Sequence, residues 1–218
     1  VLFRSLGDHE NAIKYLRKSI GFAGLLTAEE KDYSLAYDYA FLVSNFQELN
    51  QVDSAAKYLR LALSRVKHIE ELEDVKFQNA AFIGYATAAE FYLQQEVADS
   101  AHFYIEYASA FSEPFYGFYI QKYRIQHAML IKDYPAVERL MDIDRTSLEA
   151  DEKLAWLDLQ QAYYQVIEDF PRLAVVQQEM LKAREAEFTE DQRLFSSFAD
   201  GKYEMLKKNE QIKGLQLT

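Results

Sequence analysis

An internal repeat limits what this chain can fold into more than any other feature. Residues 53–63 read Asp-Ser-Ala-Ala-Lys-Tyr-Leu-Arg-Leu-Ala-Leu, and the pattern returns in residues 99–108 as Asp-Ser-Ala-His-Phe-Tyr-Ile-Glu-Tyr-Ala. The shift of 46 residues places Tyr58 on Tyr104 and alanines on alanines. Small and large apolar residues three or four positions apart form a helical stripe. Each copy is therefore predicted to be a helix that starts at the polar Asp-Ser pair.

The same shift extends backwards along the chain, where it places Tyr39 on Tyr85. The repeating object is therefore a pair of helices, and a recurring helix pair is typical of a solenoid. We predict an all-α chain, an α-solenoid of stacked antiparallel helix pairs with a longer C-terminal helix. The aromatic residues expected to fill the space between helices are Tyr39, Phe46, Tyr85, Tyr92, Tyr104 and Trp156.

Composition supports this prediction and excludes several functions. Half of the 218 residues are hydrophobic, while the helix breakers glycine (7) and proline (3) are rare. The formal net charge of −11 argues against binding of nucleic acid or of an anionic membrane surface. The chain has no cysteine, which excludes disulfides and thiolate chemistry, and no uninterrupted apolar run long enough to span a membrane.

Polar signals predict where the helices begin. Thr27 and Glu30 form a capping box before a helix that runs to about Leu49, and similar boxes occur in residues 146–149 and 189–192. Another helix is predicted from about residue 69 to 95. Its first residues, Glu70, Glu71, Glu73 and Asp74, are expected on a solvated helical face rather than at a cation site.

Two later helix pairs repeat with a shorter period. Asp133-Tyr134-Pro135 matches Asp169-Phe170-Pro171 at a shift of 36 residues, and Ile120 then falls on Trp156. Residues 112–114 are expected to end the preceding pair. Beyond the array, Met205, Ile212 and Leu215 have a spacing compatible with a coiled-coil seam.

Residues 7–20 read Gly-Asp-His-Glu-Asn-Ala-Ile-Lys-Tyr-Leu-Arg-Lys-Ser-Ile, in which Gly7 suits a tight turn and Ala12 a close helix approach. This passage resembles the second half of a tetratricopeptide repeat, with residues 1–6 as the end of its first helix. The resemblance implies about four and a half repeats in residues 1–187, the first of them truncated, and a capping or connector helix in residues 188–218. The C-terminal segment also resembles the helix that links helical-repeat sensor regions to downstream modules in bacterial membrane regulators.

The repeat family binds its ligands along the first helix of each pair, on the concave side. With Tyr39, Tyr85 and Trp156 as register marks, the resemblance points to a groove that binds a protein or peptide partner. Ala40, Ala86 and Leu93 also belong to this register. The residues expected in the groove are Tyr37, Ser44, Gln47, Glu48, Ile83, Glu90, Gln94, Gln161, Tyr164 and Gln165.

No constellation of residues points to catalysis, and we expect neither a catalytic residue nor a cofactor. The four histidines, His9, His68, His102 and His127, include no pair at i and i+4, as a helical zinc site requires. We therefore predict no metal site. An all-α hydrolase or lyase is retained as a minor alternative.

The expected function is that of a non-catalytic interaction or sensing module. Two versions stay open: a fragment of a larger bacterial regulator, or a free-standing adaptor that joins proteins through its groove. A homodimer through the C-terminal helix is a further alternative. The compartment is open between cytoplasm and periplasm, with a lean to the extracytoplasmic part of a membrane regulator.

Overall fold

The structure is a computed structural model that describes residues 8–111, 116–142, 148–186 and 189. These residues form helices and no strand, which confirms the all-α prediction. The chain divides into two compact units, residues 1–143 and 144–218. The predicted boundary at 187/188, the C-terminal helix with Gly201, Met205, Ile212 and Leu215, and the segments 1–6 and 112–114 lie outside the described residues.

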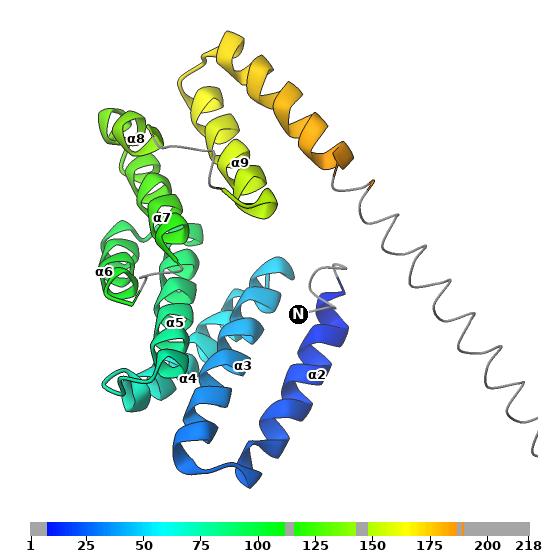
Figure 1. Ribbon diagram of the computed structural model, residues 1–218, viewed down its shortest axis with the longest axis vertical. Coiled ribbons are helices and arrows are strands. Elements are labelled where there is room, and N and C mark those ends of the chain that lie inside the picture. Colours follow the sequence, from blue (N-terminus) through cyan, green and yellow to red (C-terminus); the bar gives the residue numbers. More distant parts are fainter. Residues whose placement is uncertain (1–7, 112–115, 143–147, 187–188, 190–218) are drawn as a thin grey trace, which may run out of the picture. The chain divides into compact units, whose positions relative to one another are not determined.

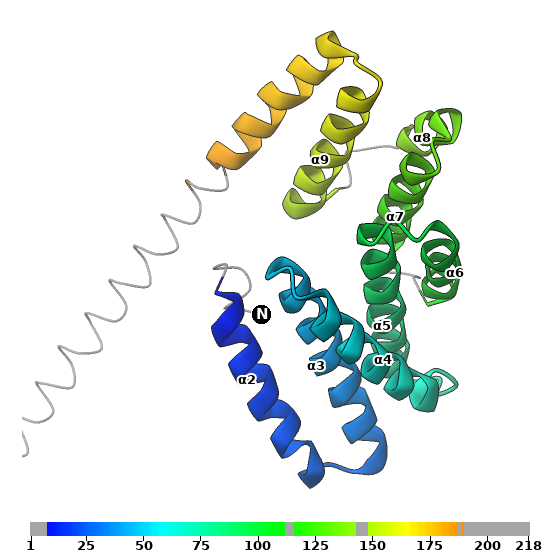
Figure 2. The ribbon, with the colours of Figure 1, turned by 180° about the vertical axis from the view of Figure 1, so that it is seen from behind.

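Helices follow one another with short connections in both units (Figures 1 and 2). Those of the first unit are α2 (His9–Phe22), η1 (Ala23–Leu25), α3 (Ala28–Glu48), α4 (Val52–Ile69), α5 (Val75–Gln94), α6 (Ala98–Ser109), α7 (Gly117–Leu130) and α8 (Tyr134–Met141). The second unit contains α9 (Ala150–Val166) and a helix over residues 170–186.

Helix contacts in the first unit follow a regular order. α3 packs on α4, α5 on α6 and α7 on α8, so these helices form three consecutive pairs. The first helices of the pairs also contact one another, α3 with α5 and α5 with α7. The second helix of each pair contacts the next first helix, as α4 does with α5 and α6 with α7. Each of these helices thus contacts mainly the helices that are next, or next but one, along the chain.

The same aromatic contacts recur in two successive pairs. The Tyr58 ring on α4 lies 5.9 Å from Tyr39 and 5.4 Å from Phe46, both on α3 (centroid distances). The shift of 46 residues gives the equivalent contacts on α6 and α5, Tyr104 to Tyr85 at 6.3 Å and Tyr104 to Tyr92 at 5.5 Å. The predicted aromatic packing between paired helices is therefore confirmed for these two pairs.

Alanines bring the paired helices close enough for those rings to meet. Ala55, Ala62, Ala101 and Ala108 are fully buried, and they occupy equivalent positions on α4 and α6. In the second unit the predicted interior residue Trp156 is also buried. Leu157 packs there against Val176 and Met180, which joins α9 to the helix over residues 170–186.

One turn recurs inside each helix pair, and its spacing matches the repeat read from the sequence. A non-glycine residue with positive φ ends the first helix, and the next residue donates its N–H back into that helix. At the first such turn, Gln51 N–H donates to the Phe46 carbonyl at 2.8 Å. The positive-φ residues lie 46, 36 and 36 positions apart: Asn50, Glu96, Lys132 and Glu168.

The connection between α4 and α5 differs from its prediction. The expected helix over residues 69–95 begins at Val75, because Ile69 is still the buried end of the α4 stripe. Asp74 then caps α5 by accepting a hydrogen bond from the Lys76 N–H at 2.9 Å. The acidic residues before it therefore lie in the connection rather than on a helical face, and Glu70 accepts a hydrogen bond from the Tyr85 hydroxyl.

Of the other predicted helix starts, the one at Thr27 is confirmed, and the helices near residues 53, 99 and 149 begin at other residues than expected. Thr27 caps α3 as expected, accepting from the Glu30 N–H at 3.4 Å. α9 is capped by Glu149, whose N–H donates to the Glu152 carboxylate at 3.0 Å; residues 146 and 147 of the expected capping box lie outside the described residues. The Asp-Ser pairs at 53 and 99 lie in the first turns of α4 and α6 rather than at their caps. Of the box at 189–192, only Thr189 is described.

Close packing of α4 on α5 depends on the absence of a side chain at Gly84. A methyl group there would overlap Cγ2 of the fully buried Val66. We predict that Gly84→Ala lowers the free energy of unfolding by about 1–3 kcal/mol, measured by urea denaturation. Val66→Ala in the same chain should then cost less than it does alone. Gly21→Ala is the control, because its methyl group meets no atom within 4 Å; a similar loss there would contradict this explanation.

A buried carboxylate gives stability a pH dependence. Asp38 on α3 is 9% exposed, and its Oδ2 has no hydrogen-bond partner among the described residues. Burial raises the pKa of Asp38, and a hydrogen bond from Ser19 opposes this rise. The carboxyl group of Asp38 therefore binds a proton more tightly in the folded chain than in the unfolded chain. Its contribution to the free energy of unfolding is present at low pH and is lost as the pH rises from about 4.

We predict that Asp38→Asn raises the free energy of unfolding at pH 7 by about 1 kcal/mol. The gain should shrink as the pH is lowered towards 4, when measured by urea denaturation at a series of pH values. Asp32→Asn is the control: Asp32 accepts from Arg65 at 3.0 Å, so its loss should be destabilising. Parallel pH profiles for the wild type and Asp38→Asn would contradict the burial argument.

Candidate functional site

A hollow of about 250 Å³ lies on the face where α3, α5 and the start of α7 meet. We call it the aromatic hollow because five aromatic rings border it. From α3 and α5 it is lined by Phe41, Ser44, Phe82, Ile83, Ala86, Thr87 and Glu90. On the α7 side it is lined by Tyr116, Tyr119, Lys122 and Tyr123.

The residues that line the aromatic hollow occupy equivalent positions in successive repeats. The shift of 36 residues that separates the turns at Glu96 and Lys132 also carries residue 83 to 119, 86 to 122 and 87 to 123. The shift of 46 carries residue 41 to 87 and 44 to 90. The hollow is therefore built from the same positions of three successive first helices, which the regular helix contacts bring side by side.

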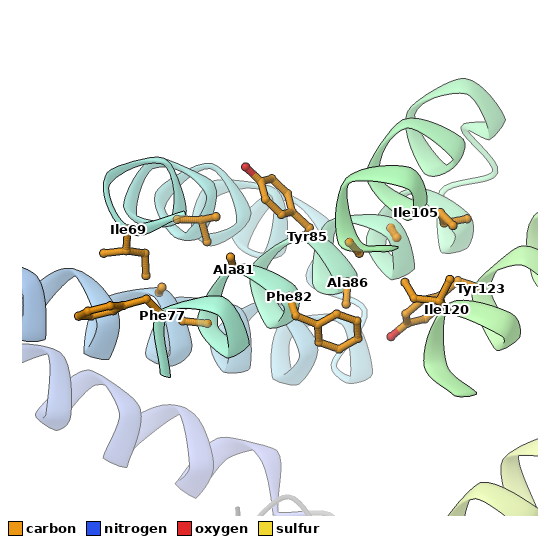
Figure 3. Packing of buried hydrophobic residues seen from close by; sticks show 14 residues of the cluster. Ile69, Phe77, Ala81, Phe82, Tyr85, Ala86, Ile105, Ile120 and Tyr123 are labelled. Atoms are coloured by element: carbon orange, nitrogen blue, oxygen red, sulfur yellow. The ribbon is translucent and has the colours of Figure 1, made fainter. Parts of the chain in front are cut away.

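The floor of the aromatic hollow belongs to the hydrophobic core. Phe82 and Tyr123 are buried, and the Phe82 ring stacks on Tyr116 with centroids 4.0 Å apart. In Figure 3 Phe82 and Tyr85 leave α5 on opposite sides, so one helix supplies both this floor and the interior of its own pair. Ala86 lies on the side of α5 that faces Tyr123 in the same view. Rings fixed in a core give the hollow a preformed shape.

Two charged side chains line this hollow without pairing. Lys122 places its Nζ 5.6 Å from the centroid of the Tyr123 ring, a cation–π contact. Glu90 is half-buried on α5, and within the described part of the chain it has no cation within 4 Å. The groups that this hollow offers are therefore aromatic rings, one carboxylate and one ammonium group.

A second, smaller hollow of about 170 Å³ shares Glu90 with the first. We call it the amide hollow, because Gln94 and Gln126 line it together with Leu93. Gln47 on α3 donates its amide N–H to the Gln94 side-chain oxygen at 2.6 Å. Glu90 therefore lies where the two hollows meet. We call the two hollows together the strip, which is aromatic on one side of Glu90 and amide-rich on the other.

Several residues predicted for the groove meet at this strip. Ser44, Ile83 and Glu90 line the aromatic hollow, as does Ala86. Leu93 and Gln94 line the amide hollow, and Gln47 is hydrogen-bonded to Gln94. Tyr37 lies beside it, packed on Tyr33 at 5.1 Å between centroids, and burial raises its pKa to about 12. Ala40 is buried in the core, and Glu48 is exposed outside both hollows.

The predicted groove residues of α9 belong to the second unit. Tyr164 packs against the apolar cluster of that unit, and the Arg172 guanidinium lies 5.0 Å from its ring centroid. Gln161 is partly exposed and Gln165 exposed. Whether any of the ten residues binds a partner stays a prediction.

Sequence reasoning missed the α7 side of the site. The shift of 36 residues, applied to Ile83, Ala86 and Glu90, gives Tyr119, Lys122 and Gln126, so the signal was present in the repeat itself. Phe41, Phe82 and Thr87 on α3 and α5 were also missed, although the longer shift relates positions 41 and 87. Tyr116 precedes α7 as its N-terminal flanking residue, and no repeat pattern marks it.

The histidines take structural positions. His9 shares a hydrogen bond with Asn45 at 3.0 Å, and His68 pairs with Asp32 at 3.0 Å. The His102 and His127 rings lie 5.3 Å apart, and burial together with this neighbour lowers the pKa of His127. Among the described residues no three His, Asp or Glu side chains are grouped for a metal ion.

Within the described ranges, no helix combines the length and the apolar character needed to cross a membrane. Comparisons with protein-family models, with curated proteins and with solved structures find no match to this chain. The site therefore has to be interpreted from its own residues.

Proposed function

We propose that the chain is a tetratricopeptide-like α-solenoid that acts as a non-catalytic interaction module. In this proposal the first helices α3, α5 and α7 form the inner face of the array. A peptide segment of a partner protein binds there, across the aromatic and amide hollows. The sequences of residues 53–63 and 99–108, with the Gly-Asp pair at residues 7 and 8, support the repeat assignment.

The observation that carries this proposal is the convergence of equivalent positions on one strip. Three successive first helices each contribute the same register positions, and beside a few aliphatic residues these positions hold aromatic, amide and charged side chains. Rings and amides that stay accessible along a row of helices suit an extended peptide, since rings contact its side chains and amides its backbone. A site for chemistry would instead need a nucleophile or a general base held by a partner.

The size of the site supports a peptide over a cofactor. Small-molecule pockets are typically about 300–1,000 Å³, and the aromatic hollow is smaller than that. A volume of this size suits one or two side chains. The strip continues past Glu90 into the amide hollow, so a ligand that lies along the helices contacts more surface than one confined to a single hollow.

The test is selection from a displayed library of random dodecapeptides. We predict that the wild-type chain enriches related peptides and that Ser44→Trp with Gln126→Trp, which fills both hollows, abolishes their binding. The control is Ser64→Trp with Gln51→Trp, the same additions at exposed positions that line neither hollow, which should leave binding unchanged. Circular dichroism of all three proteins checks that helicity is retained. Peptides that bind the filled variant as well as the wild type would refute the proposed function.

A further inference from the structure

We propose that the strip selects an extended peptide in which an aromatic side chain and a lysine or arginine side chain are two residues apart. This inference rests on the proposed function and assigns a ligand class to the same site. The aromatic side chain would enter the aromatic hollow, and the basic side chain would reach Glu90 at the junction with the amide hollow.

The shape and lining of the aromatic hollow favour an aromatic side chain. Phe82 and Tyr116 form a fixed stack at its floor, and Tyr119 and Tyr123 border it from α7. Aromatic pairs in offset or edge-to-face geometry contribute about 0.5–1.5 kcal/mol beyond the area they bury. A volume of about 250 Å³ accepts one ring with part of its backbone. An aliphatic side chain would fill the same space without the ring contacts.

Charge places the basic side chain at Glu90. This carboxylate is half-buried, lines both hollows and has no cation within 4 Å in the described part of the chain. The charge of Lys122 is directed instead to the Tyr123 ring, on the other side of the aromatic hollow. A formal net charge of −11 for the whole chain also draws cationic ligands towards it.

Backbone geometry sets the spacing of the two side chains. In an extended peptide, side chains i and i+2 point to the same side, roughly 6–7 Å apart. Glu90 borders the aromatic hollow directly, so one such step takes the ligand from the rings to the carboxylate. The hydrogen bond from Gln47 occupies the side-chain oxygen of Gln94, so its amide nitrogen can donate to a ligand carbonyl.

Binding of three acetylated, amidated and fluorescently labelled heptapeptides tests this inference. They are Ala-Ala-Phe-Ala-Lys-Ala-Ala, the same peptide with Glu for Lys, and the same peptide with Ala for Phe. By fluorescence anisotropy, we expect the Phe/Lys peptide to bind about tenfold more tightly than the Phe/Glu peptide. Glu90→Gln should remove this preference, and the matched variant Glu71→Gln, an exposed carboxylate that lines neither hollow, should retain it. Replacing Phe by Ala should weaken binding in all three proteins.

The possible failures are distinguishable. A Phe/Glu peptide that binds as tightly as the Phe/Lys peptide, or a preference that survives Glu90→Gln, overturns the inference. Library peptides that depend on the hollows but carry no basic residue also overturn it, while the proposed function stands. A library that yields no hollow-dependent peptide overturns both. Circular dichroism and thermal unfolding of Glu90→Gln show whether the variant folds, and Glu90→Asp provides a second variant that should keep the lysine preference.

Discussion

The first unit depends on one contact that is made twice: a tyrosine from the second helix of a pair inserted between two rings of the first helix. Tyr58 makes this contact in α3–α4 and Tyr104 makes it in α5–α6. Fully buried alanines on the same helix faces bring the backbones close enough for the rings to meet. Because the rings fix the rotation of each helix about its own axis, they also fix which residues of α3 and α5 point away from the pair.

The candidate site follows from that fixed rotation. On α5, Tyr85 faces the partner helix and Phe82 faces the opposite side (Figure 3), so the positions that follow Phe82 lie along α3 and α7. The close approach of α4 at Gly84 keeps α5 in place from a third direction. The strip with Glu90 at its junction is thus held by core packing on several sides, so its shape is preformed.

The repeat period was readable from the sequence because it is set by packing. Rings and alanines that meet across a pair recur 46 residues apart, and the turns at Asn50 and Glu96 share that interval, whereas the turns at Lys132 and Glu168 follow at the shorter interval of 36. The α4–α5 boundary was misplaced because the apolar stripe continues to Ile69, and only the Asp74 cap reveals where α5 begins. Tyr116 could not be predicted, since its place depends on stacking with Phe82 rather than on any local pattern.

The rotation of α3 and α5 can be measured directly, because the chain contains no cysteine. With Gln47→Cys and Gln94→Cys, a short bismaleimide should cross-link the two helices within one molecule, since these side chains are hydrogen-bonded at 2.6 Å. Moving both cysteines one residue on turns the first, at position 48, by about 100° around α3 and carries the second, at position 95, past the end of α5, which should prevent the cross-link. Efficient cross-linking of the displaced pair, or none of the first pair, would contradict this arrangement of the first helices.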